Sequence, residues 1–293
     1  MNINMKYYIV TICAIFIALG VGILVGFNLN YDQALSAQQS EVLESFNKEF
    51  EDLKGKNKDL QSEIKDLNGD ITTLKEFVGK NIDALTKDVL TDKTTGIILT
   101  REKDDYSEDI EQLIKNANGK VAFNIVVKDN ISKQEKLEEL SNELNETFKT
   151  SDDVINYIVE SLNSAKGYEK LNALQDLGVI KINDLDEQTF STYDSVVLLG
   201  EISGNDIKNK FNEKEKVIID KLKEESKYLV AANKTNSDNT ILELYSGNDI
   251  STIDNINEGI GKFSLTNLLK NQNSVGHYGT SDVSTELIAY ENN

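Results

Sequence analysis

The hydrophobic and polar positions divide the chain into three stretches with different periodicities. The first is an uninterrupted apolar run from Tyr7 to Phe27 that contains no charged residue. At about 1.5 Å per residue, a helix of this length reaches roughly 32 Å, enough for a hydrocarbon core of about 30 Å. A cleaved signal peptide is the alternative, but its apolar region usually has about 7–15 residues. The pattern therefore predicts an uncleaved transmembrane helix within residues 1–28.

The residues around and within this run indicate the orientation of the helix in the membrane and a face that could pack against a second helix. Lys6 and the N-terminal amine are the only positive charges on its short side, and no acidic residue precedes Asp32. The positive-inside tendency then places the N-terminus in the cytoplasm and residues 29–293 outside. Small residues that recur every four positions are Ala14, Ala18, Gly22 and Gly26. This spacing permits close helix pairing in a membrane, although Ala and Gly are also common in membrane helices generally.

The second stretch, residues 29–90, repeats its apolar positions in steps of three and four. Heptad position d holds Phe46, Leu53, Leu60, Leu67 and Leu74. Heptad position a holds Leu43, Phe50, Asn57, Ile64, Ile71 and Val78. Leu at d with β-branched residues at the later a positions favours a parallel two-stranded coiled coil, and the single Asn penalises other registers.

Charged residues that flank the a and d positions agree with a parallel homodimer. Glu49 with Lys54, and Asp70 with Lys75, occupy positions that pair opposite charges across two parallel chains. The alternative is an amphipathic helix that packs on its own domain, but a sustained period of about 3.5 residues gives a narrow, straight stripe and argues against it. We therefore predict a parallel coiled-coil stalk.

The third stretch, residues 91–293, alternates short apolar runs with amphipathic segments. The apolar runs, which predict strands, cover 95–100, 121–127, 194–200, 228–232 and 251–253. The segments that predict helices cover 107–115, 132–148, 152–164, 168–176, 211–225 and 259–270. This alternation indicates a Rossmann-like α/β domain with a mostly parallel sheet. The interval 130–190 is nearly all helix or loop in this interpretation, and is compatible with a helical insertion.

Three segments follow predicted strands, where open parallel sheets form their sites. Thr100 and Arg101 follow the first strand. The segment GEISGND (200–206) lacks a P-loop lysine and a full dinucleotide fingerprint, so an ordinary turn is favoured over a phosphate site. The segment GHYG (276–279) holds the only histidine, which we expect in an exposed loop. The candidate partner-binding positions are Gly200, Glu201, Gly204, Gly276, His277, Tyr278 and Gly279.

Composition narrows the function classes. The chain has 50 acidic against 31 basic residues and a net charge of -19, which argues against nucleic acid as the main partner. The single cysteine, Cys13, excludes a disulfide framework or a multi-cysteine metal site within one chain. His277 could act as a general base or metal ligand, but no motif supplies a nucleophile or an orienting carboxylate, so a structural role is favoured. We predict no catalytic residue, no metal site and no cofactor.

Four segments, spread from the first helix to the C-terminal region, carry a resemblance to a known family. They are NMKYYIVTICAIFIALGVGILVG (4–26), TGIILTRE (95–102), STIDNINEGIGKFSLTNLL (251–269) and VGHYGTSDVSTELI (275–288). In order and architecture they resemble the MctB-type copper transport outer membrane proteins, a family that includes SteB-like cell-division proteins. The resemblance implies a membrane-anchored partner of a soluble protein, in complexes that control peptidoglycan hydrolases and cell separation.

The family name also implies copper handling, which would require copper-binding side chains. Copper(I) favours thiolate, thioether and imidazole ligands. Beyond the predicted membrane helix the chain has no Cys, no Met and only His277, while Met1 and Met5 precede that helix. We therefore expect a non-enzymatic dimeric scaffold or regulator in cell-wall remodelling at division, with copper export or homeostasis as the alternative.

Overall fold

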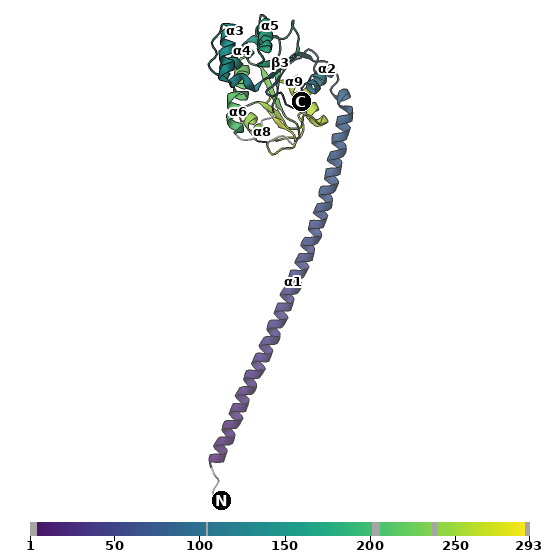
Figure 1. The fold of residues 1–293 in the computed structure, drawn as a ribbon. Coiled ribbons are helices and arrows are strands. Elements are labelled where there is room, and N and C mark those ends of the chain that lie inside the picture. Colours follow the sequence, from purple (N-terminus) through teal and green to yellow (C-terminus); the bar gives the residue numbers. More distant parts are fainter. Residues whose placement is uncertain (1–4, 104, 201–205, 236–238, 291–293) are drawn as a thin grey trace. The chain divides into compact units, whose positions relative to one another are not determined.

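The computed structural model describes the chain except residues 1–4, 104, 201–205, 236–238 and 291–293 (Figure 1). Two compact units are present, Met1–Ile71 and Thr72–Asn293. One helix, α1 (Met5–Leu85), contains most of the first unit and the beginning of the second. Because the sequence has no proline, nothing in it removes a backbone donor and interrupts a helix of 81 residues.

In the first unit, α1 is apolar and then amphipathic. Met5–Phe27 has a mean hydropathy of 2.8 and none of it is buried, so this segment is a candidate membrane span. Further along, the a and d positions from Phe46 to Ile71 lie on the same helix and are exposed. Both predicted segments are helical and belong to one continuous helix, which ends at Leu85. The pairing of two such helices stays a prediction.

In the second unit, the end of α1 packs on the α/β domain. Val78 is 9% exposed, and Lys75 forms an ion pair of 2.9 Å with Glu258. The assignment of Val78 to the coiled coil is therefore wrong, since its own domain covers it. Lys75, which was predicted to face Asp70 of a second chain, has an acidic partner in its own chain. Gly259 allows this packing, because a β-carbon there would lie 2.5 Å from the Cα of Gly79.

The domain contains a seven-stranded sheet with the order β3-β2-β1-β4-β5-β6-β7. The strands are β1 (Thr94–Leu99), β2 (Lys120–Val127), β3 (Ile180–Leu185), β4 (Ser195–Leu199), β5 (Tyr228–Ala232), β6 (Ser251–Ile253) and β7 (His277–Tyr278). All neighbours pair in parallel except β2 and β3. The predicted mostly parallel sheet is confirmed. Strand order reverses beside β1, and a crevice forms outside the carboxyl ends at such a point.

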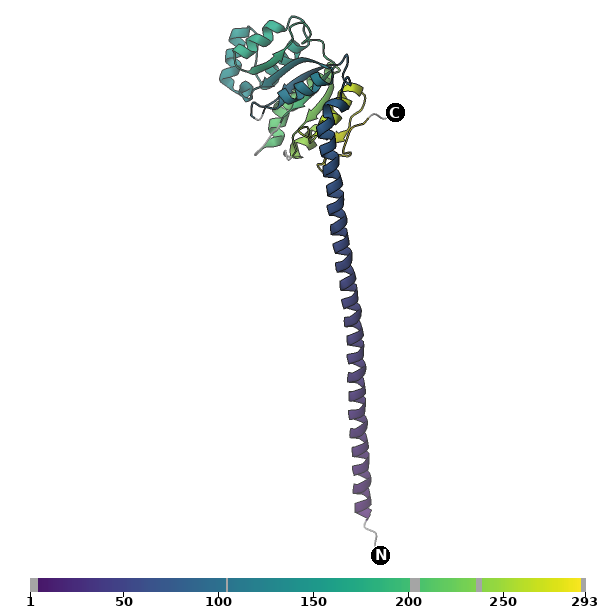
Figure 2. The ribbon, with the colours of Figure 1, turned by 90° about the vertical axis from the view of Figure 1, so that its right-hand side faces the viewer.

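Helices cover both faces of this sheet (Figure 2). They are α2 (Ser107–Asn116), the 3-10 helix η1 (Asp129–Ser132), α3 (Gln134–Leu144), α4 (Ser151–Leu162), α5 (Tyr168–Asp176), α6 (Ile207–Glu213), α7 (Glu215–Glu224), α8 (Asn239–Ser246) and α9 (Gly259–Asn271). Because successive strand residues point to opposite faces, Ile98 and Leu198 join one core while Ile97 and Leu199 join the other. The result is a three-layer α/β domain.

Several predicted elements agree with the structure and others do not. The helix at 168–176 and the strands at 228–232 and 251–253 have the predicted bounds. The interval 130–190, predicted as nearly all helix or loop, also contains β3, the antiparallel edge strand, which was not predicted. The helix predicted at 211–225 is two helices, α6 and α7, which separate at Lys214. Strand β7 and helix α8 were not anticipated.

Candidate functional site

A cavity of about 280 Å³ lies outside the carboxyl ends of β1 and β2 and beside the junction of α6 and α7. Its lining includes Thr100 and Arg101, two residues that the sequence placed at a strand end. The remaining lining residues are Asp129, Ile131, Ser132, Ser151, Lys210, Glu213, Lys214 and Glu215. This position is the crevice expected where the strand order reverses.

Lys214 holds the ends of two strands together at this cavity. Its ammonium group donates to the backbone oxygens of Thr100 (2.7 Å) and Val127 (3.2 Å), and to Asp129 Oδ1 (2.6 Å). The side chain is only 11% exposed, so these three acceptors replace the water that it loses. The interruption between α6 and α7 lies at Lys214 itself, whose backbone leaves helical geometry (φ -134°, ψ -70°).

Beside Lys214, three buried oxygen-bearing side chains converge on the end of β4. A β-carbon added at Gly200 would lie 2.5 Å from Thr100 Oγ1, 2.8 Å from the Tyr245 hydroxyl and 3.7 Å from Glu215 Oε1. Thr100 Oγ1, Glu215 Oε2 and the Tyr245 hydroxyl have no hydrogen-bond partner within the described part of the chain. Buried polar atoms are nearly always paired in folded proteins, so this cluster has unused hydrogen-bonding capacity.

Burial changes the acidity of this cluster. It raises the pKa of Glu215 to about 7, although the charges of Lys214 and Arg101 act in the opposite direction. Burial also raises the pKa of Tyr245 well above its ordinary value. The carboxyl group of Glu215 therefore changes charge near neutral pH, unlike an ordinary glutamate.

The glycine-rich segment after β4 contributes to this cavity only through its first residue. Gly200 is buried, and its carbonyl accepts from the Asn233 side-chain nitrogen at 2.8 Å when that amide is oriented to satisfy both of its ends. Gly200 is thus not on the surface where a partner would meet it. Glu201 and Gly204 lie outside the described residues.

The GHYG segment is an edge strand and an anchored turn, so the expectation of an exposed loop is wrong. His277 and Tyr278 form β7, and His277 Nδ1 lies 3.0 Å from Thr252 Oγ1 on β6. Both side chains are half-buried, and burial lowers the pKa of His277. Gly276 precedes this strand and is itself half-buried. These contacts fit a structural role for the histidine.

Gly279 explains the end of that segment. Its φ is +138°, and a β-carbon there would overlap the carboxylate of Asp254. Asp254 accepts from the backbone N–H groups of Thr280 (2.8 Å) and Ser281 and from the Ser284 hydroxyl (3.0 Å). Only glycine combines this φ with this approach, so Gly279 serves the fold and is too buried to contact a partner.

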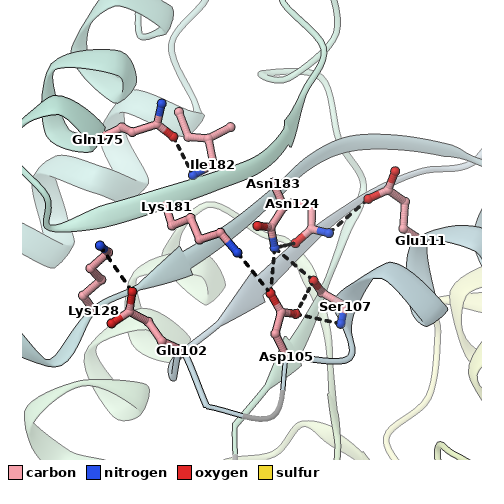
Figure 3. Close-up of polar contacts among 10 residues, drawn as sticks. All are labelled: Glu102, Asp105, Ser107, Glu111, Asn124, Lys128, Gln175, Lys181, Ile182 and Asn183. Atoms are coloured by element: carbon pink, nitrogen blue, oxygen red, sulfur yellow. Dashed lines mark hydrogen bonds and ion pairs between the residues drawn. The ribbon is translucent and has the colours of Figure 1, made fainter.

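A second polar cluster joins the start of α2 to β2 and β3 (Figure 3). Asn124 Nδ2 donates to Glu111 Oε2 (3.0 Å), while Asn183 Nδ2 donates to Asp105 Oδ2 (3.0 Å) and to Ser107 Oγ (3.2 Å). Burial would raise the pKa of Asp105, but hydrogen bonds from Ser107 and Asn183 outweigh it and the pKa is lowered. None of these five side chains has a buried polar atom without a partner, so the cluster has a structural role.

The same region covers part of the sheet edge at β3. The Ile182 N–H donates to Gln175 Oε1 of α5 at 2.8 Å, and Lys181 lies 3.7 Å from Asp105 Oδ2 (Figure 3). Among the described residues, no group of three or more His, Cys, Asp or Glu side chains is placed to hold a metal ion.

The predicted pairing residues all lie on α1. Ala14, Ala18, Gly22 and Gly26 are exposed, and a β-carbon added at Gly22 or Gly26 would meet nothing within 4 Å. Along the stalk, Phe46, Phe50, Leu53, Leu60, Ile64, Leu67, Ile71 and Leu74 are between 43% and 68% exposed. Asn57 is exposed between them, and its Oδ1 accepts from Gln61 Nε2 at 2.9 Å.

Comparisons with known proteins give a family for the chain. No curated protein matches it significantly. The family model described as "Copper transport outer membrane protein, MctB" matches residues 2–288, nearly the whole chain. The apolar helix Met5–Phe27 and this description both fit a membrane protein of the cell envelope, in a family linked to copper transport. The chain belongs to the MctB family, as its four family-like segments predicted.

Proposed function

We propose that this protein is a single-pass envelope protein that acts as a non-enzymatic, dimeric scaffold or regulator in cell-wall remodelling at division. The observation that carries the proposal is the row of exposed apolar side chains on α1 beyond the candidate membrane span. Covering one large apolar side chain contributes about 1.5–3 kcal/mol, so a continuous row of them favours association strongly. In this proposal, the N-terminus is cytoplasmic and residues 29–293 lie outside the cell membrane.

A second copy of the same helix is the occupant that fits this row. The spacing of Leu at d and of Ile at the later a positions suits a parallel pair, and Asn57 would meet its counterpart at the seam. The small-residue face from Ala14 to Gly26 would pair in the membrane with the same symmetry. Two independent parts of α1 thus support a parallel homodimer.

The α/β domain would then act by binding a partner at a fixed distance from the membrane. Its strand order, with the reversal beside β1, supports a Rossmann-like architecture. The proposal assigns no reaction to it: the polar partner of His277 is Thr252 rather than a carboxylate, and catalysis by a histidine base needs an oriented nucleophile. In this proposal, the α/β domain recognises another envelope or division protein.

Copper handling is the second candidate, and the family description favours it. The donor set beyond the candidate span fits it poorly, because that part of the chain has no Cys or Met and one His. Titration of the full-length protein in detergent micelles with copper(I) separates the two proposals. Stoichiometric binding that is lost in His277→Ala would favour copper handling over the scaffold.

A complementation experiment tests the scaffold in cells. In a deletion strain, the wild-type gene and the control Ser62→Glu should restore cell separation, because Ser62 occupies the outer f position of its heptad. Leu60→Glu with Leu67→Glu should fail, since both place charge in the seam. A deletion strain with normal cell separation and copper hypersensitivity would contradict the scaffold and support the alternative.

A further inference from the structure

The end of α1, residues 72–85, lies in the same compact unit as the α/β domain, and the domain covers only one side of it. That side carries Val78, which is buried, and Ile82, which packs against the core. It also carries Lys75, which forms the ion pair with Glu258. These three residues of α1 occupy heptad positions a and e. The domain therefore lies against the a and e side of its own helix.

The neighbouring side of the same segment is apolar and exposed. Leu74 is 47% exposed, Phe77 58% and Leu85 40%. At 3.6 residues per turn, these three side chains start within about 80° of one another around the helix axis. An exposed ion pair of 3.0 Å between Glu76 and Lys80 lies beyond them on the side away from the domain. An apolar patch with a polar rim often marks a site of association.

We propose that this face binds the same face of a second copy of the chain, so that the dimer contact continues past the stalk and reaches the domain at Phe77. The inference rests on the proposed parallel homodimer. In a parallel two-fold pair, each residue lies level with its own counterpart, so an apolar face meets an apolar face. Leu74 is the last d position of the stalk, and Phe77 and Leu85 follow it on the same helix. The exposed face is thus a continuation of the predicted contact.

The domain changes which residues can face the partner. A regular parallel coiled coil places positions a and d between the helices and positions e and g at the flanks. Val78 is the a position at this height, and its own domain already covers it. The second helix can therefore approach only from the d and g side, where Phe77 occupies g. The contact should shift toward g at this point, with each domain on the a and e side of its own helix.

Other occupants fit this face less well. Its own domain lies on the adjacent side, where it covers Val78 and leaves Phe77 exposed. Lipid is distant, because at about 1.5 Å per residue α1 rises roughly 75 Å between Phe27, the end of the candidate span, and Phe77. A different protein on this face would keep the two copies of Phe77 apart, which the following experiment detects.

Cysteine cross-linking of the full-length chain in membranes tests the contact. In a Cys13→Ala background, Phe77→Cys, Val78→Cys and Lys80→Cys each carry one thiol, and Leu60→Cys reports on the stalk. We expect covalent dimers from Leu60→Cys and Phe77→Cys upon mild oxidation, and several-fold less from Val78→Cys and Lys80→Cys. A regular coiled coil would give the opposite order for positions 77 and 78, since a faces the partner and g flanks it.

The outcomes separate this inference from the proposed function. Cross-linking of Leu60→Cys but not of Phe77→Cys would overturn the inference and leave the stalk dimer in place. More dimer from Val78→Cys than from Phe77→Cys would also overturn it, because the contact would then continue without a shift. Failure of both Leu60→Cys and Phe77→Cys would overturn the homodimer itself.

A second measurement does not depend on the geometry of a thiol pair. Phe77→Glu places charge on the apolar face and should weaken dimerisation of the full-length protein in detergent micelles about tenfold or more, as measured by sedimentation equilibrium. Because Phe77 is exposed, the urea midpoint of the domain should stay at the wild-type value. Ser62→Glu, at an outer f position, should leave dimerisation unchanged. A wild-type dissociation constant for Phe77→Glu would overturn the inference.

Discussion

Gly79 on α1 and Gly259 at the start of α9 approach so closely that a β-carbon added at Gly259 would lie 2.5 Å from the Cα of Gly79. The neighbouring atoms are backbone atoms of α1, which cannot rotate away as a flexible side chain would. Gly259→Ala should therefore lower the free energy of unfolding of the domain by about 1–3 kcal/mol, the usual cost of overpacking. Unfolding in urea, monitored by tyrosine fluorescence because the chain has no tryptophan, measures this free energy.

Gly247→Ala is the matched control for this contact. A β-carbon at Gly247 would come no closer than 3.4 Å to the Glu243 carbonyl oxygen, an ordinary contact distance. We expect its unfolding free energy to stay within about 0.5 kcal/mol of the wild type. Equal effects of the two substitutions would contradict close packing between α1 and α9.

The stalk prediction can be tested by disulfide formation in membranes. In a Cys13→Ala background, Leu60→Cys places a thiol at a d position, where parallel chains face each other, and should give a covalent dimer upon mild oxidation. Ser62→Cys in the same background places the thiol at f, facing water, and should cross-link far less. Non-reducing gel electrophoresis distinguishes the two, and a monomeric Leu60→Cys protein would refute the parallel pair.

Glu215 predicts a pH dependence of stability. Its pKa rises from an ordinary 4.5 to about 7 on folding, so the folded state binds the proton more tightly than the unfolded state does. The stability from this group is therefore fully present below about pH 4.5 and is lost as pH rises through about 7. Glu215→Gln stays neutral, and its stability relative to the wild type should increase between about pH 5 and 8, by on the order of 3 kcal/mol at most.

Unfolding midpoints of both proteins across this pH range provide the measurement. Other carboxyl groups titrate in both proteins and cancel in the difference, and Glu169→Gln controls for the loss of one exposed charge. Parallel curves for the wild type and Glu215→Gln would show that the carboxyl group of Glu215 titrates normally.

Asp254 predicts a local effect on the C-terminal turn. Asp254→Asn replaces one acceptor oxygen with a donor, opposite the N–H groups of Thr280 and Ser281 and the Ser284 hydroxyl. The loss of charged hydrogen bonds should cost about 1.5–3 kcal/mol and speed amide exchange in residues 279–285, as measured by mass spectrometry. Asp282→Asn, an exposed aspartate in the same turn, should leave the exchange unchanged.

The sequence predicted the elements whose burial pattern is continuous and missed those that depend on distant partners. The strands at 228–232 and 251–253 are apolar or flanked by clear turns, so their bounds were correct. The edge strand β3 was missed because polar residues interrupt its apolar positions, and because the partner of Asn183, Asp105, lies far away in the sequence. The separation of α6 from α7 was also missed, since it depends on backbone oxygens of β1 and β2 that bind Lys214.

The candidate site was predictable in position but not in composition. Thr100 and Arg101 were expected at a strand end, and they line the cavity. Glu215 was not singled out, because a glutamate at the start of an amphipathic helix is normally solvated. Its carboxyl group lies near Gly200, as the Tyr245 hydroxyl does, and a lone sequence gives no signal that these distant residues come together.

The hydrogen bond between Gln175 and the Ile182 N–H restricts how another protein can associate with this domain. Growth of a sheet by an added strand needs free main-chain donors along the edge, and a glutamine occupies one of them here. Strand addition at β3, the route that leads many exposed sheets to domain swapping or fibrils, is thus obstructed by one side chain. A protein that added a strand along this edge would first have to displace Gln175 from the Ile182 N–H.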